Sequence, residues 1–229
     1  MEFHNFWYLL LLIGIALIPV IYNIKYPINF IAPLKYFLPA FLFTGTIFVI
    51  WNIRFTEIQI WSFSPYYTTG IELLNLPIEE WLSLLVFSSF SMYFYEQVKS
   101  RFCNFEKPNY FLAFSLILVV FIGLLAWYSR QKLYPFFTFF LLFIYLGYTI
   151  FRNRFKKHLT KFYLTYLVTL IPFFLLKGIL CNLPALMYEN MHTLGIRVWN
   201  VPVEDFGYLF LLLIMNISIF EYLKERRFY

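Results

Sequence analysis

The chain has 229 residues, of which 62% are apolar and only 13% are charged, and its formal net charge is +6. A water-soluble domain has about 25% charged and 45–50% apolar residues, so a chain of this composition cannot cover a surface that faces water. The composition therefore excludes a soluble domain and indicates a protein that crosses a membrane several times. The 31 Phe, 19 Tyr and 6 Trp fit this class, because Phe suits lipid contact and Trp and Tyr favour the membrane interfaces.

Residue counts also argue against several kinds of catalytic site. The three histidines lie far apart and form no HxxH pattern, which argues against a histidine-rich di-iron oxygenase. The eight glycines contain no GxGxxG, so a flavin or nicotinamide fingerprint is absent. The single aspartate, Asp205, cannot supply the Asp-rich pairs that hold magnesium diphosphates, and the two cysteines lack zinc-ligand spacing. We therefore expect an activity that uses no cofactor and no metal.

Seven stretches have the length and apolar character of transmembrane helices, which need about 20 predominantly apolar residues. In chain order they are Phe6–Asn23, Leu34–Trp51, Pro77–Gln97, Tyr110–Ser129, Leu133–Phe151, Phe162–Leu180 and Pro202–Tyr222. No basic segment precedes the first stretch and no small-residue cleavage site follows it, so we expect it to remain as a membrane anchor. The sequence thus predicts an all-α, polytopic transmembrane bundle of about seven helices.

Lys and Arg residues are distributed unevenly between the two ends of these spans. Most of them follow the first, third, fifth and seventh spans, and five lie between Arg152 and Lys161. The positive-inside rule therefore predicts a multi-pass protein of the inner (cytoplasmic) membrane, with the N-terminus outside and the C-terminus in the cytoplasm. We interpret the basic residues as contacts for lipid headgroups, so the expected partner is the lipid bilayer and not a nucleic acid.

An internal repeat has a constant offset of 125 residues. The segment Gly70–Trp81 (GIELLNLPIEEW) aligns without gaps on Gly195–Phe206 (GIRVWNVPVEDF). Two further residues of the first repeat, Glu96 and Lys99, fall on Glu221 and Lys224. Matches of this number in one register indicate two copies of one structural unit.

The repeat predicts how the chain is organised. Spans one to three correspond to spans five to seven, and the fourth span connects them. A single connecting helix gives two three-helix units the same orientation in the membrane, so the repeats are parallel. We expect a first repeat at residues 1–104, a linker helix at 105–131 and a second repeat at 132–229.

The repeated motif P-x-E-[ED] places two adjacent carboxylates in the first turn of each of two helices. Proline is favoured at the first helical position, so Glu79 and Glu80 follow at the start of one helix, and Glu204 and Asp205 at the start of the other. Two such helices packed about a pseudo-twofold axis would bring up to four carboxyls together. Helix capping would explain one isolated motif. Its repetition, and the cost of acidic groups near a membrane, favour a site that donates protons or stabilises a cation.

Two other groups of charged residues have structural interpretations. Glu96 and Glu221 lie at the opposite ends of the same two helices, beside lysines, and we expect interfacial ion pairs there. Lys177 lies near the outer end of the sixth span, and we expect its amine to extend toward the interface.

The two motifs, NLPIEEW and NVPVEDF, resemble those of the membrane-integral, non-flavin lycopene and carotenoid cyclases. The likeness covers nearly the whole chain and includes the stretch Trp61–Tyr67 (WSFSPYY) before the first motif and Tyr188 before the second. Both halves are present in one chain, so it is similar to the fused form, which implies that no second subunit is required. One departure is Trp51-Asn52, where the family has Trp-Asp, so any role of that aspartate does not carry over.

The resemblance implies that lycopene ψ-ends are cyclised to β-ionone rings, giving γ- or β-carotene. An acid protonates the terminal double bond, the carbocation closes the ring, and a base removes a neighbouring proton, all without electron transfer. The residues expected to form this acid–base site are Glu79, Glu80, Glu204 and Asp205. Aromatic residues expected to bind substrate and stabilise the cation are Trp61, Tyr66, Tyr67, Trp81, Trp199 and Phe206.

Three alternatives stay open from the sequence. Parallel three-helix repeats with membrane carboxylates also describe small proton-coupled transporters. A structural membrane component would tolerate neutralisation of all four carboxylates. Within the enzyme class, a cyclase that makes ε-rings or acts on C50 substrates differs only in which proton leaves and how long its pocket is. The sequence assigns neither the acid nor the base.

Overall fold

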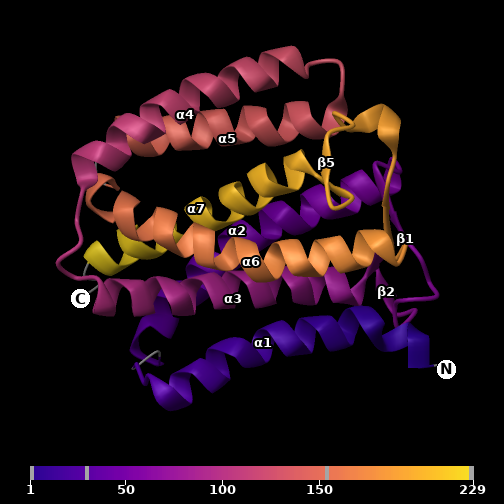
Figure 1. Cartoon of the computed structure of the whole chain (residues 1–229), viewed down its shortest axis with the longest axis horizontal. Helices are drawn as coiled ribbons and strands as arrows, with labels where there is room; N and C mark the ends of the chain where they lie inside the picture. Colours follow the sequence, from indigo (N-terminus) through magenta and orange to yellow (C-terminus); the bar gives the residue numbers. More distant parts are fainter. Residues whose placement is uncertain (1–2, 29–30, 153–154, 227–229) are drawn as a thin grey trace.

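The computed structural model describes residues 3–28, 31–152 and 155–226, so Arg154 of the basic cluster lies outside the described residues. Seven α-helices lie side by side along one common direction (Figure 1): α1 (Trp7–Lys25), α2 (Ile31–Glu57), α3 (Ile78–Arg101), α4 (Pro108–Tyr128), α5 (Leu133–Phe151), α6 (Leu159–Asn182) and α7 (Val203–Glu225). Each of the seven predicted spans overlaps one of these helices. The predicted all-α polytopic bundle is confirmed.

Among the described helices, six are long and apolar enough to cross a membrane, and α3 is the exception. It has 24 residues, but many of its side chains are polar. Its buried polar residues are Glu79, Glu80, Ser83, Ser88, Ser91 and Gln97. The helix packs between α1, α2, α6 and α7, so these groups face protein and not lipid.

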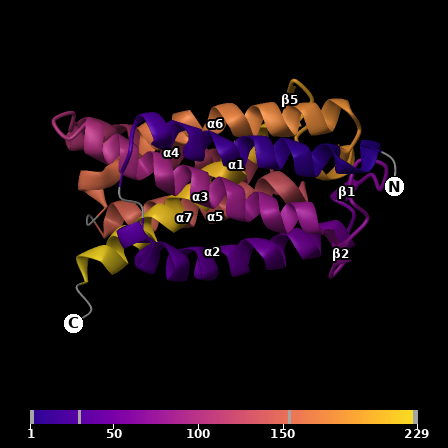
Figure 2. The same cartoon turned by 90° about the horizontal axis from the view of Figure 1, so that it is seen from below.

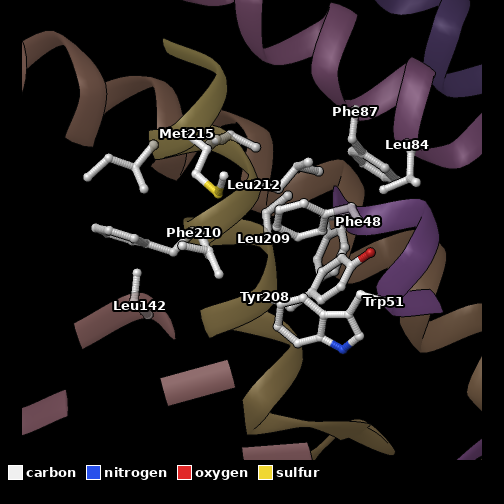
Figure 3. Close-up of a cluster of buried hydrophobic side chains, with 14 of the residues drawn as sticks. Phe48, Trp51, Leu84, Phe87, Leu142, Tyr208, Leu209, Phe210, Leu212 and Met215 are labelled. Carbon is white, nitrogen blue, oxygen red and sulfur yellow. The ribbon is translucent and has the colours of Figure 1, made fainter. Parts of the chain in front are cut away.

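Helix α7 is the central helix of the bundle. In its most apolar stretch 72% of the residues are buried, against 17% in α1 and in α4, which form the outer faces. Figure 3 shows Tyr208 and Leu209 of α7 packed against Phe48 and Trp51 of α2. The Tyr208 ring meets Phe48 and Trp51 edge-on, with centroids 4.9 and 5.2 Å away. Such pairs each contribute about 0.5–1.5 kcal/mol beyond the burial of their area.

All the short strands lie at one end of the bundle, near the N-terminus, and the C-terminus lies at the other (Figure 2). We call the first end the hairpin end and the second the tail end. The strands are β1 (Trp61–Phe63), β2 (Glu72–Leu73), β3 (Leu76–Pro77), β4 (Leu186–Tyr188), β5 (Arg197–Val198) and β6 (Val201–Pro202). Three short 3-10 helices complete the described elements: η1 (Phe3–Phe6), η2 (Lys156–His158) and η3 (Asn190–His192).

Strands β1 and β4 locate a pseudo-twofold axis. They pair antiparallel, with Ser62 opposite Met187, and these two residues are related by the repeat offset. The flanking pairs are Trp61 with Tyr188 and Phe63 with Leu186, so the register is symmetric about the central pair. The axis therefore passes between equivalent strands of the two repeats, along the bundle. This arrangement fits parallel repeats.

The two hairpins repeat the same backbone conformation. In β2–β3 the central residues Leu74 and Asn75 have φ of 56° and 58°, and in β5–β6 Trp199 and Asn200 have φ of 49° and 63°. Two consecutive positive φ values are the signature of a type I′ turn, which matches the twist of a two-residue hairpin. Each hairpin leads directly into a helix that begins with the motif carboxylates.

The motif proline lies one position earlier than the sequence predicted. Pro77 and Pro202 occupy the N-cap positions of α3 and α7, with extended ψ values of 141° and 142°. Each also ends a strand, because it is the last residue of β3 or β6. The carboxylates therefore occupy the second and third helical positions, where the positive end of the helix dipole favours a negative charge.

Candidate active site

A small cavity on the pseudo-twofold axis lies at the hairpin end, between α2, α3, α5, α6 and α7. Its lining residues are Asn52, Trp61, Phe63, Glu80, Tyr134, Lys177, Leu186, Tyr188, Asp205 and Tyr208. Eight of these ten form four pairs at the repeat offset: Asn52 with Lys177, Trp61 with Leu186, Phe63 with Tyr188, and Glu80 with Asp205. The volume is about 20 Å³, which suits a single water molecule. A larger ligand therefore requires side chains or helices to move.

Glu80 of α3 is one of the two carboxylates that line the cavity. It is 5% exposed, and its Oε1 accepts a hydrogen bond from the Tyr8 hydroxyl of α1. The same oxygen lies 3.4 Å from Nζ of Lys177 of α6. The expectation that Lys177 extends toward the interface is therefore wrong: its side chain is 12% exposed and turns inward.

Asp205 of α7 is the second carboxylate of the cavity, and its hydrogen-bond partners are all uncharged. Tyr134 of α5 donates to Oδ1 over 2.5 Å and Tyr188 of β4 donates to Oδ2 over 2.6 Å. Burial raises the pKa of Tyr188 well above its usual value of 10.0, so this hydroxyl keeps its proton at neutral pH. In each repeat, a tyrosine near the start of the first helix thus bonds the second carboxylate of the motif.

The first carboxylate of each motif points away from the cavity and bonds the preceding loop. Oε1 of Glu79 accepts the Thr69 N–H over 2.7 Å, and Oε1 of Glu204 accepts the Leu194 N–H over 2.5 Å. Both side chains are fully buried, and within the described residues their Oε2 atoms have no hydrogen-bond partner. The four carboxylates therefore divide into an inner pair, Glu80 and Asp205, and an outer pair, Glu79 and Glu204. The catalytic role expected of all four stays a prediction.

Of the six aromatic residues expected to contact a substrate, only Trp61 lines the cavity. Its ring lies edge-on to Tyr134, with centroids 5.2 Å apart. Tyr66 is 49% exposed and stacks on His4, and Trp199 is 47% exposed and packs against α6. The other three, Tyr67, Trp81 and Phe206, are partly buried outside the cavity lining. A substrate role of these five stays a prediction.

Several cavity residues were not predicted as site residues. Tyr134, Lys177 and Tyr208 lie in largely apolar stretches of α5, α6 and α7, and no sequence motif marks them. A signal was present in the repeat, since Lys177 is equivalent to Asn52 and Tyr188 to Phe63. Residues that break the symmetry between two copies are candidates for function, because an asymmetric reaction needs unlike groups at like positions.

The tail end carries the ion pairs that the sequence predicted. Lys99 contacts Glu221 over 2.5 Å and Lys224 contacts Glu96 over 3.0 Å, so each pair joins α3 to α7. His158 lies 3.7 Å from Glu221 and its other ring nitrogen bonds the Tyr95 hydroxyl. The prediction of interfacial ion pairs is confirmed, and these pairs connect the two repeats.

Comparison with known proteins identifies both halves of the chain with one family. A family model described as Lycopene cyclase matches residues 5–98 and 131–223. The two matched segments correspond to the two repeats, and the stretch between them, 99–130, contains α4. No curated protein and no solved structure matches the chain.

Proposed function

The chain belongs to the lycopene cyclase family, and on that premise we propose that it converts the ψ-ends of lycopene into β-ionone rings, giving γ- or β-carotene. Family membership identifies a carotenoid cyclase, and the β-ring and the mechanism are the proposed part. One observation carries the mechanism. Glu80 and Asp205 come from equivalent positions of two repeats and line one buried cavity among aromatic rings.

The proposed reaction needs one acid and one base on opposite sides of the ψ-end. The acid protonates the terminal double bond and produces a tertiary carbocation. The second double bond attacks this centre, which closes the ring and moves the positive charge to a ring carbon. The base then removes the proton from the neighbouring ring carbon, and a ring double bond forms. Both carboxyls are buried, at 5% and 2% exposure, and exclusion of water protects the cation from quenching.

Aromatic faces around the cavity support the carbocation step. Trp61, Tyr134 and Tyr188 lie together on one side, with the Tyr134 and Tyr188 rings stacked at 6.2 Å between centroids. Tyr208 lines another part of the cavity, and Trp51 packs behind it with ring centroids 5.2 Å apart. A positive charge over such faces is stabilised by about 2 kcal/mol when desolvated.

The proposal also includes a location and a subunit composition. The distribution of Lys and Arg supports the inner (cytoplasmic) membrane with the N-terminus outside, which places the hairpin end on the outer side. Both repeats supply a carboxylate to the same cavity, so one chain is sufficient for the reaction and no second subunit is required. The polyene of lycopene is about as long as a bilayer is thick, and we propose that it enters sideways between helices.

Expression of the chain in a bacterium that accumulates lycopene tests the proposal, with pigments separated by chromatography. The expected result is conversion to γ- or β-carotene, and the ratio of the two measures one-ended against two-ended action. A variant carrying both Glu80→Gln and Asp205→Asn is the matched control and should leave lycopene unchanged. Unchanged lycopene with the native chain inserted in the membrane would overturn the proposal. Pigments with ε-rings would overturn the β-ring assignment alone.

A further inference from the structure

The inner carboxylates have unlike neighbours at like positions. Lys177 of α6 lies 3.4 Å from Glu80. Asn52 of α2 is the residue equivalent to Lys177, so the pseudo-twofold axis places it on the Asp205 side of the cavity. Asn52 is neutral and its Oδ1 accepts a hydrogen bond from Tyr208 over 2.8 Å. The two repeats therefore place residues at equivalent positions around the cavity, but the amine beside Glu80 has a neutral amide as its counterpart on the Asp205 side.

Charge balance limits how many protons the cavity carries. Its lining contains two carboxyls, Glu80 and Asp205, and one amine, Lys177. With both carboxyls ionised the site would bury a net negative charge, which is costly away from water. A neutral site has the charged amine, one carboxylate and one protonated carboxyl. The other groups near the two carboxyls are the hydroxyls of Tyr8, Ser83, Tyr134, Tyr188 and Tyr208 and the thiol of Cys181, all uncharged in this state.

We infer that Lys177 is a positioning residue that keeps Glu80 as the carboxylate and leaves the transferable proton on Asp205. An ammonium beside Glu80 favours the ionised form of that carboxyl. The hydrogen bonds that Asp205 accepts come from two tyrosine hydroxyls, and Lys177 makes its contact with Glu80. A tyrosine hydroxyl accepts a hydrogen bond as readily as it donates one, so a protonated Asp205 stays bonded. The inference rests on the proposed function and assigns the acid and the base within it.

The assignment gives a balanced reaction. Asp205 transfers its proton to the CH carbon of the terminal C=C bond of the ψ-end and becomes a carboxylate, which leaves the tertiary cation on the carbon that carries the two methyl groups. The electron pair of the second double bond forms the new ring carbon–carbon bond. Glu80 accepts the proton lost from the neighbouring ring carbon, and that C–H pair becomes the ring double bond. One proton has then moved from Asp205 to Glu80, and its return across the cavity restores the resting state. Lys177 keeps its charge throughout.

Removal of the charge at position 177 tests the inference in the lycopene-accumulating strain. Lys177→Gln keeps hydrogen-bond donors and removes the charge, whereas Lys177→Arg keeps the charge. Lys161→Gln is the matched control, because Lys161 is a buried lysine of the same helix that bonds the Phe105 carbonyl over 3.0 Å at the tail end. Cyclic pigment is measured per amount of inserted protein, and if Lys177→Gln does not insert, Lys177→Met takes its place.

We expect Lys177→Gln to lower cyclisation about 10- to 100-fold, a large part of what a general base contributes, and Lys177→Arg to keep most of it. A double variant separates positioning from a general structural role. Because Lys177 acts through Glu80, adding Lys177→Gln to Glu80→Gln should cause no further loss. If the double variant loses activity by the product of the two single losses, or if Lys177→Gln is as active as Lys161→Gln, the inference is wrong and the proposed function is unaffected. If the native chain itself forms no cyclic pigment, both the proposed function and the inference are wrong.

Discussion

Lys99 of α3 donates to Glu221 of α7 over 2.5 Å, and Lys224 of α7 donates to Glu96 of α3 over 3.0 Å, so the two helices exchange the same pair of partners. The exchange follows from the pseudo-twofold axis, since both the lysines and the glutamates are related by the repeat offset. The axis therefore passes through the cavity at the hairpin end and between these ion pairs at the tail end. The two pairs differ in burial, with Glu221 at 4% and Glu96 at 17% side-chain exposure.

This difference in burial predicts unequal effects of removing the two lysines. Lys99→Met removes the lysine partner of a buried carboxylate and leaves His158 and the uncharged Tyr95 hydroxyl beside it. We expect a loss of about 2–4 kcal/mol in the free energy of unfolding. Lys224→Met breaks a more exposed pair and should cost less than about 1 kcal/mol. Thermal denaturation of the detergent-solubilised protein measures both. Adding Glu221→Gln to Lys99→Met should restore stability, and equal effects of the two single variants would contradict the account.

The four motif carboxylates should respond differently to neutralisation. Glu80→Gln and Asp205→Asn remove the proposed base and acid, so each should lower cyclisation about 100-fold or more with the protein still inserted. In Glu79→Gln and Glu204→Gln the amide oxygen still accepts the loop N–H, so we expect less than a tenfold loss. Replacement of Glu79 or Glu204 by Val breaks that hydrogen bond and should lower thermal stability. Loss of cyclisation in Glu79→Gln at unchanged stability would show that the outer pair takes part in the chemistry.

Much of the fold was predictable because a helix that crosses the lipid bilayer needs about 20 predominantly apolar residues. Six helices are apolar over the length of a membrane, and the offset of 125 residues aligns both hairpins without gaps. Helix α3 was also predicted, although its many polar residues keep it from meeting the apolar criterion. Its polar side chains became interpretable only with the packing, which shows that α1, α2, α6 and α7 surround it.

The site was predictable only as far as the motif. Adjacent carboxylates on a helix point about 100° apart, and the sequence does not show which of the two faces inward. The answer depends on the rotation of α3 and α7, which is set by packing across the axis. The inward direction of Lys177 depends in the same way on the rotation of α6. An amine near the end of an apolar helix is typical of a side chain that reaches the interface.

The first hairpin contains a strained residue that a substitution can relieve. Leu74 has φ of 56° at the first central position of the type I′ turn, a conformation that costs a residue with a side chain roughly 1–2 kcal/mol. Because Leu74 is 63% exposed, little packing is lost on its removal. We expect Leu74→Gly to raise the free energy of unfolding by about 0.5–1 kcal/mol. Leu73→Gly, in strand β2 of the same hairpin, is the control and should give no gain in thermal denaturation.

The second hairpin is held against α6 at a glycine. A Cβ atom at Gly178 would lie 2.1 Å from Cε3 of Trp199, with two further ring atoms within 2.9 Å. The hairpin tip is also bonded to this helix, since Asn200 donates to Asn182 over 2.9 Å. Trp199 therefore has a packing role, and its contact with α6 positions the strand that leads into Glu204 and Asp205.

Gly178→Ala should displace the Trp199 ring and with it the start of α7. We expect a cost of about 1–3 kcal/mol in stability and a parallel fall in cyclisation, because the displaced hairpin leads into the first turn of α7, which carries Asp205. Gly147→Ala on α5 is the matched control, since nothing lies within 4 Å of its added Cβ and alanine is favoured in a helix by about 1 kcal/mol. Adding Trp199→Ala to Gly178→Ala should recover stability by removing the clash. A Trp199→Ala variant that loses cyclisation at unchanged thermal stability would instead assign Trp199 to substrate binding.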